Sequence, residues 1–454
     1  MSRLCQWYKG RPDDLQFHAT LGRNPAWADY QVLGPCYGAV SMLLGTDDIL
    51  PVFVTARGCA VHTRFTKYAW GPDFGMTGKP LPFLDFTRTQ VVNGMYTARQ
   101  GQLRALNRIV TAKGIRLVVL LCGDDVILSG DSLEGLAAQL QENLGIPARV
   151  LRVSGISGAN PWEGYDGALG LVYDQVWDTE VREGERQGVN LVGWKWPSRE
   201  RDHDIGVCLH LLGQLGVTVN HVLPGGAALA DFADSLRSRA NVLWCSSYIG
   251  PTLERLEKEK RLRLAGHQTP YGFEGTRLWI EEVALALEDK SLIARGCQLA
   301  DQYRDELDER KQKLQGKRAF VSGGPGRLMG LLHMMADFEV DVVAVGLYWM
   351  NAESRAMLEN VFQRFPRQPE VLVVSPSLYE LEEITQTLRP DVWLGGYQEL
   401  HSCKKYKIPF VPTTLYVKSH QCFEGCIMLG DKMIRAMEGY DFVANAFVSA
   451  EMHC

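Results

Sequence analysis

The chain has 454 residues, too many for one hydrophobic core, and its 46% apolar and 22% charged residues are usual for a globular protein of two or three domains. The net charge of -5 gives no overall basic character for nucleic acid, no apolar run could span a bilayer, and the N-terminus lacks a signal-peptide core. We therefore expect a cytoplasmic protein without nucleic-acid or membrane partners, whose eleven cysteines are metal ligands, reactive thiols or buried residues rather than disulfides.

The first part of the chain holds three cysteines that each have a glycine within two residues, namely Cys36, Cys59 and Cys122. Small neighbours let the backbone approach a bulky group. None of the three belongs to a C-x-x-C pair, which excludes a zinc ribbon or a bacterial ferredoxin motif for them. Three thiolates leave an ordinary four-ligand iron–sulfur site incomplete, so a cluster here needs a ligand from another subunit. Three unrelated buried thiols are the alternative that spacing alone favours.

Apolar runs that predict strands alternate with helical stretches along the whole chain. The predicted strands are 115–121, 188–193, 217–220, 240–244, 317–324, 340–346, 370–375 and 390–396, and helices are predicted at 131–144, 205–215, 253–264 and 301–313. This pattern predicts an α/β fold with mainly parallel sheets, in three Rossmann-like domains over 1–185, 186–312 and 313–454. Ligands bind at the carboxyl ends of such strands, where Cys122 and Cys245 stand.

The order of these motifs resembles the α subunits of the nitrogenase family. Cys36, Cys59 and Cys122, the last before Gly-Asp-Asp, match the three cysteines that in this family hold half of a cluster at the interface with the β subunit. The resemblance implies an interfacial 8Fe-7S cluster of the P type, or a 4Fe-4S cluster. It also implies a homologous β-type subunit in an α2β2 heterotetramer.

The resemblance continues in the second and third predicted domains. The segment Asn241–Ile249 is similar to the family segment whose cysteine binds the terminal iron of the active-site cofactor, and Cys245 is that residue. The glycine loop Ser322–Arg327 resembles the loop beside the cofactor, where Arg327 would donate hydrogen bonds to cluster sulfides. The resemblance therefore implies an iron–sulfur cofactor of the 8Fe-9S-C type.

Three departures separate the chain from nitrogenase itself. Pro161 and Tyr165 stand where nitrogenase has a Gln and a His near its reactive iron face, and Gln398 stands where it has a lysine that helps to hold homocitrate. These changes point to a cofactor without homocitrate and to a substrate other than dinitrogen. The second cofactor ligand stays open, because the direct offset falls on Thr414. The candidates that follow or precede it are His420, Cys422, His401 and Cys403.

Among families that share this fold, the chain is most similar to the D-type α subunit of methylthio-alkane reductases. These enzymes cleave C–S bonds of small organic sulfides and release methanethiol and a hydrocarbon for sulfur salvage. Two related alternatives are a cofactor-assembly scaffold and a chlorophyllide-type tetrapyrrole reductase subunit, the latter disfavoured by Cys245. An α/β protein with structural thiols, such as a nucleotide-sugar binding protein, is the unrelated alternative.

The resemblance also implies how electrons arrive. The chain has no G-x-x-x-x-G-K-S/T loop, so ATP hydrolysis falls to a partner, a homodimeric iron protein with a 4Fe-4S cluster. The first cluster would relay electrons to the cofactor at Cys245, which His420, Cys422 and Arg327 would help to bind. Tyr165, Arg327 and His420 are the candidate catalytic residues around a small organic sulfide. Arg64 and Lys67 are additional candidate donors.

Overall fold

A computed structural model describes most of the chain. The described residues are 34–55, 80–93, 96–128, 133–156, 160–178, 186–194, 201–245, 247, 250–259, 261–265, 269–374, 376–396, 399–413 and 419–439. Several residues named above lie outside them, namely Cys59, Arg64, Lys67, Gln398 and Thr414. The described residues group into an N-terminal unit within Leu33–Arg201 and Val217–Ala265, and a C-terminal unit within Asp202–Gly216 and Gly266–Cys454.

The first sheet of the N-terminal unit has three parallel strands, in the order β1 (Ile49–Val54), β2 (Leu117–Cys122) and β3 (Ala148–Arg152). Every residue of β1 and β2 is buried, as expected for strands covered on both faces. One apolar cluster joins these strands to α4 (Gln100–Lys113) and α6 (Glu134–Leu144). The remaining helices among the described residues of this part are α1 (Pro35–Leu43), α3 (Arg88–Val92), α5 (Asp124–Ile127) and α7 (Pro161–Gln175).

The second sheet of this unit is also parallel, in the order β5 (Val219–Leu223), β4 (Arg186–Val192), β6 (Ser238–Leu243) and β7 (Leu264–Ala265). Its helices are α9 (Leu229–Ser235) and α10 (Pro251–Lys258). The chain runs outward from β4 to β5 on one side and from β6 to β7 on the other. The carboxyl ends of β4 and β6 therefore form the switch point where α/β sheets bind ligands, and Cys245 follows β6 there.

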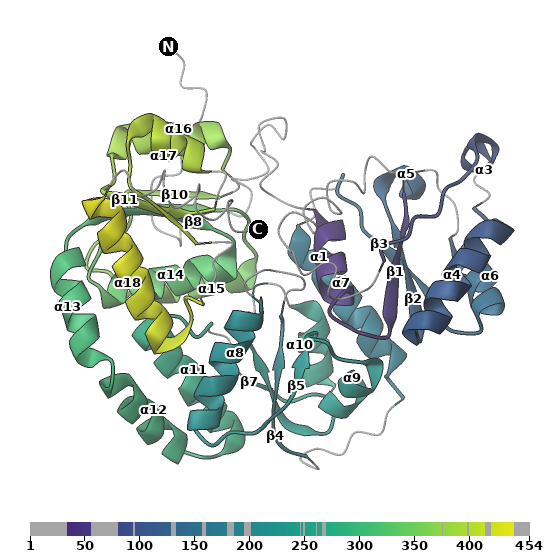
Figure 1. The fold of residues 1–454 in the computed structure, drawn as a ribbon, viewed down its shortest axis with the longest axis horizontal. Coiled ribbons are helices and arrows are strands. Elements are labelled where there is room, and N and C mark those ends of the chain that lie inside the picture. The colour runs from purple at the N-terminus through teal and green to yellow at the C-terminus, as the bar shows by residue number, and fades with distance from the viewer. Residues whose placement is uncertain are drawn as a thin grey trace. The chain divides into compact units, whose positions relative to one another are not determined.

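The C-terminal unit has a parallel sheet in the order β10 (Val371–Val374), β9 (Asp341–Leu347), β8 (Arg318–Gly323), β11 (Val392–Gly395) and β12 (Phe410–Pro412). One apolar cluster joins it to α14 (Pro325–Asp337), α15 (Ala352–Phe362) and α18 (Cys422–Glu438), and a second joins it to α16 (Leu378–Leu388) and α17 (Leu400–Tyr406), which Figure 1 shows on its two faces. The other helices of this unit are α8 (Arg201–Gln214), α11 (Gly272–Leu287), α12 (Ser291–Asp301) and α13 (Arg304–Leu314).

The α/β class with mainly parallel sheets is confirmed, since each of the three sheets is parallel throughout. Each sheet lies inside one of the three predicted domains, whereas α8, α11 and α12, expected in the middle domain, group with the C-terminal unit. The exact domain limits stay a prediction. None of the described helices combines the length and the apolar character that crossing a membrane requires.

Candidate functional site

The first cysteine group lies in the N-terminal unit. Cys36 is the second residue of α1 and is half-buried, and Cys122 is the last residue of β2 and is fully buried. Cys59 is outside the described residues, so the set of three stays a prediction. Burial raises the pKa of the Cys122 thiol to about 12. This thiol therefore stays protonated until a metal ion binds its sulfur and displaces the proton.

The Gly-Asp-Asp sequence after Cys122 holds the neighbouring loops in place by close packing and hydrogen bonds. A Cβ at Gly123 would lie 2.3 Å from Thr55 Oγ1, so only glycine lets the ends of β1 and β2 come this close. The Asp124 carboxylate accepts hydrogen bonds from the Ser154 hydroxyl and from backbone N–H groups beyond it. Burial alone would raise the pKa of Asp124, but these donors hold it below its usual value. The motif thus fixes the loops after β1 and β3 around Cys122.

Gly38, two residues after Cys36, serves helix packing. A Cβ at Gly38 would lie 1.7 Å from the carbonyl oxygen of Pro161, and a Cβ at Gly164 would lie 1.8 Å from that of Pro35. Helices α1 and α7 therefore cross with their backbones in contact. The glycine that the sequence suggested for the approach of a cluster is needed here for the approach of α7.

Cys245 stands two residues beyond the end of β6, at the switch point of the second sheet. It is only 2% exposed, and its Sγ lies 3.0 Å from Ser247 Oγ. Trp194, which follows β4, and Trp244 stack with ring centroids 4.2 Å apart. The buried Trp194 Nε1 has no hydrogen-bond acceptor among the described residues, and an unpaired buried donor costs about 1–3 kcal/mol. A thiol and an indole N–H that lacks an acceptor suit a sulfur-rich group.

Helix α7 positions the chain on both sides of this switch point. Tyr165 is fully buried, and its hydroxyl donates to the carbonyl oxygen of Trp194 over 2.7 Å. The neighbouring Asp166 carboxylate accepts hydrogen bonds from the N–H groups of Gly250 and Thr252, over 3.0 and 3.2 Å, where α10 begins. The contact found for Tyr165 is thus structural, and the catalytic role predicted for it stays a prediction.

His420 is fully buried in the C-terminal unit, two residues before the start of α18. A Cβ at Gly425 would lie 2.2 Å from the carbonyl carbon of His420, so the first turn of α18 packs directly on the histidine backbone. His420 Nε2 lies 2.6 Å from Lys432 Nζ. Burial and then the positive charges of Lys432 and Arg327 lower the pKa of His420 well below its usual value. The imidazole is therefore neutral, which is the form that binds metals.

Arg327 lies half-buried in the first turn of α14, close enough for its charge to act on His420. Two of the predicted site residues, Arg327 and His420, thus interact electrostatically in the C-terminal unit. The structure adds Lys432, which the sequence analysis missed. Two cations beside a buried neutral imidazole suit an anionic ligand that accepts hydrogen bonds, as iron–sulfur groups do.

The other candidates for the second ligand have different surroundings. Cys422 begins α18 with a left-handed φ of 60°, and its N–H donates to Pro270 over 2.6 Å. Its thiol contacts Cys208 of α8, and burial together with this contact raises the pKa of Cys208 well above its usual value. Cys403 lies on α17 and is buried in the apolar cluster that joins α16 and α17 to the sheet, and His401 is exposed on α17.

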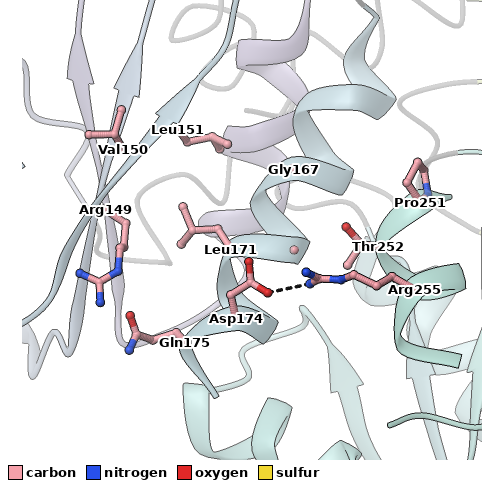
Figure 2. A pocket seen from close by; sticks show the side chains of 11 residues that line it. Arg149, Val150, Leu151, Gly167, Leu171, Asp174, Gln175, Pro251, Thr252 and Arg255 are labelled. Carbon is pink, nitrogen blue, oxygen red and sulfur yellow. Dashed lines mark hydrogen bonds and ion pairs between the residues drawn. The ribbon is translucent and has the colours of Figure 1, made fainter. Parts of the chain in front are cut away.

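A groove with a cavity volume of about 570 Å³ runs along β3, α7 and α10 in the N-terminal unit (Figure 2). Arg149 borders it on the β3 side, and an ion pair of 2.6 Å between Asp174 and Arg255 borders it on the other. None of the predicted site residues lines this groove. In the described part of the chain, no three His, Cys, Asp or Glu side chains converge on one metal-ion position.

Comparisons with known proteins give the family. The model of the family described as nitrogenase component 1 type oxidoreductase matches residues 35–438. The cofactor biosynthesis protein NifE of Methanococcus maripaludis is 22% identical over 290 residues, which are 62% of this chain and 58% of that protein. The chain therefore spans less than two thirds of that relative. The nitrogenase molybdenum-iron protein alpha chain of Methanothermobacter marburgensis is 24% identical over 431 residues, 88% of this chain and 86% of the relative.

Two further comparisons point the same way. One component of the light-independent protochlorophyllide reductase of Prosthecochloris aestuarii is 24% identical over 385 residues, 76% of this chain and 68% of the relative. The solved structure titled "Nitrogenase Cp1 at pH 6.5" aligns with a TM-score of 0.71 at 16% identity, over 92% of this chain and 90% of that chain, which shows the shared fold. Because the family model matches nearly the whole described chain, this protein belongs to the nitrogenase component 1 type oxidoreductase family.

Proposed function

We propose that this chain is the catalytic, α-type subunit of a nitrogenase-like reductase that cleaves C–S bonds of small methylthio compounds. The reaction takes two electrons and two protons per R–S–CH3, breaks the R–S bond, and forms R–H and methanethiol for sulfur salvage. Membership of an oxidoreductase family supports a reduction. The choice of a methylthio substrate rests on the resemblance set out above.

The observation that carries the proposal is the surroundings of Cys245. Its thiol is buried just beyond the carboxyl end of β6, directly after Trp244, on which the ring of Trp194 with its buried N–H stacks. A thiolate binds iron strongly, and N–H donors stabilise the sulfurs of such groups. These residues suit an iron–sulfur cofactor of the 8Fe-9S-C type better than a tetrapyrrole, which needs an apolar cavity and no thiolate.

His420 is our candidate for the second ligand, because it is neutral, buried and flanked by Arg327 and Lys432. The two cations would offset the negative charge of the cofactor and donate hydrogen bonds to its sulfurs. When bound, an iron–sulfur cofactor supplies electrons and an iron surface that sulfur binds. The protein's own part is to hold this group, to exclude water and to place donors around it.

Cys36, Cys59 and Cys122 would bind the first cluster, of the 8Fe-7S or 4Fe-4S type, together with ligands from a homologous β-type subunit. Two such pairs would form an α2β2 heterotetramer. Electrons would arrive from a separate, homodimeric 4Fe-4S iron protein that hydrolyses ATP. Burial raises the pKa of the Cys122 thiol to about 12, so metal binding would have to displace its proton.

Pro161 and Tyr165 stand where nitrogenase has a Gln and a His, and this difference supports a substrate other than dinitrogen. Pro161 begins α7 and is buried against α1, and the Tyr165 hydroxyl donates to the carbonyl oxygen of Trp194. Both side chains therefore have packing contacts in the metal-free chain. With Gln398 in place of the lysine, we propose a cofactor without homocitrate.

A cofactor-assembly scaffold is the second candidate, favoured by the similarity to NifE. The two candidates differ in turnover. The test is to purify the complex anaerobically and to supply iron protein, dithionite as the electron source, ATP and dimethyl sulfide. We expect methane and methanethiol in equal amounts, and neither product when the iron protein is left out. A complex that carries its full iron content yet forms no product, while it transfers its cofactor to a cofactor-free nitrogenase, would show the scaffold to be correct instead.

A further inference from the structure

Two tryptophans meet at the switch point of the second sheet. Strands β4 and β6 are neighbours, with Val192 paired to Leu243, and the Trp244 N–H donates to the Val192 carbonyl over 2.8 Å. Two residues past that pair, the chain reaches Trp194 on one strand and Cys245 on the other. Both segments therefore leave the sheet at the same edge, where the ring of Trp194 stacks on Trp244, the residue before the proposed iron ligand.

The ring of Trp194 is held firmly. It is 1% exposed and stacks on Trp244 with an angle of 21° between the ring planes. The hydroxyl of Tyr165 fixes its backbone carbonyl from α7. A ring that is stacked on one side and tied through its backbone has little freedom to turn toward a distant acceptor.

The one polar group of the Trp194 side chain is its indole N–H. Trp194 Nε1 is buried, and no atom in the described part of the chain accepts a hydrogen bond from it. Buried donors in folded proteins almost always have a partner, so this exception points to an acceptor other than the described residues. The acceptor that we propose at this edge of the second sheet is a sulfur atom of the group bound at Cys245, because sulfurs in iron–sulfur proteins accept hydrogen bonds from N–H groups.

We propose that Trp194 is a positioning residue whose indole N–H donates a hydrogen bond to a sulfur of the iron–sulfur group bound at Cys245, either the thiolate or an adjacent sulfide. The inference rests on the proposed function, which places that group at Cys245. Such a bond stabilises the more negative, reduced state, so it raises the reduction potential. Trp244 would support the ring of Trp194 by stacking on one of its faces, without donating a hydrogen bond to the sulfur.

The test compares Trp194→Phe with the matched variant Trp244→Phe in the anaerobically purified complex. Phenylalanine keeps an aromatic ring for stacking and removes only the N–H and the second ring. We expect Trp194→Phe to lower the midpoint potential of the cofactor, measured by an EPR-monitored redox titration. Trp244→Phe should leave that potential nearly unchanged. Equal potentials in wild type and Trp194→Phe would overturn the inference.

A second measurement works even if Trp194→Phe fails to retain the cofactor. Tryptophan labelled with 15N at the indole nitrogen should give a weak 15N coupling to the paramagnetic cofactor in pulsed EPR, in wild type and in Trp244→Phe. No coupling in wild type would refute the hydrogen bond. Cys245→Ala separates the two proposals. If that variant keeps the full cofactor signal, the site at Cys245 is wrong; if it loses the signal and no 15N coupling is found, only the role of Trp194 is wrong.

Discussion

Replacing Gly38 by alanine tests the helix contact that connects the two cysteine sites of the N-terminal unit. The new Cβ would lie 1.7 Å from the Pro161 carbonyl oxygen, where ordinary contact begins at 3.4 Å, so α1 and α7 would have to separate by about 1.7 Å. Overpacking of this kind costs about 1–3 kcal/mol or more, and the better helix propensity of alanine returns up to about 1 kcal/mol. We expect a net loss on the order of 2 kcal/mol.

The assay is thermal unfolding of the metal-free chain followed by circular dichroism. For a unit of the size of Leu33–Arg201 with Val217–Ala265, a loss of about 2 kcal/mol should lower its Tm by about 4–8 °C. Gly206→Ala is the matched control, because Gly206 is an exposed position inside α8 with no atom within 4 Å of an added Cβ. That variant should unfold at the wild-type temperature or slightly above it. A Gly38→Ala variant as stable as Gly206→Ala would refute the backbone contact between α1 and α7.

Two more predictions concern buried carboxyl groups. Burial raises the pKa of the Glu399 carboxyl group from 4.5 to about 7. Between these two pH values the folded state keeps a proton that the unfolded state has lost. The free energy of unfolding should therefore fall by about 3 kcal/mol as the pH rises from 4.5 to 7. Glu399→Gln should remove this fall, as Tm values at pH 5 and pH 8 would reveal, and an unchanged pH dependence would count against it. Asp166→Ala should lower stability by about 1–2 kcal/mol, because it removes the hydrogen bonds that begin α10 at Gly250 and Thr252. A wild-type urea midpoint for this variant would contradict that role.

Most strands of the central sheets were predictable, because continuous apolar runs mark strands buried on both faces. Strands β1, β3 and β12 were missed. Strand β3 is partly exposed and has no continuous apolar run, and β12 has only three residues. Pro51 stands in the middle of β1 and cannot donate to a ladder. The structure places β1 at an edge of the described sheet, where proline is tolerated. The helix predicted at 253–264 ends earlier, at Lys258, because Leu264 and Ala265 pair with β6. That pairing depends on a distant strand, which local periodicity does not reveal.

The candidate site was predictable where it follows the ends of strands. The positions of Cys122 and Cys245 agree with that rule, because each lies buried at or just beyond the carboxyl end of a strand. Lys432 and Trp194 were not predictable, because neither belongs to a motif. Lys432 reaches His420 only once α18 is folded, and Trp194 meets Trp244 only through the pairing of β4 with β6.

The most direct measurement of the central claim is product formation by Cys245→Ala beside wild type, in complexes purified anaerobically with the partner subunit. Cys426→Ala serves as the control, because Cys426 is an equally buried thiol on α18 outside the proposed site. With iron protein, dithionite as the electron source, ATP and dimethyl sulfide, we predict methane and methanethiol from wild type and from Cys426→Ala. Cys245→Ala should give neither product and should lack the cofactor signal. Full cofactor signal and undiminished release of methanethiol from Cys245→Ala would contradict the account.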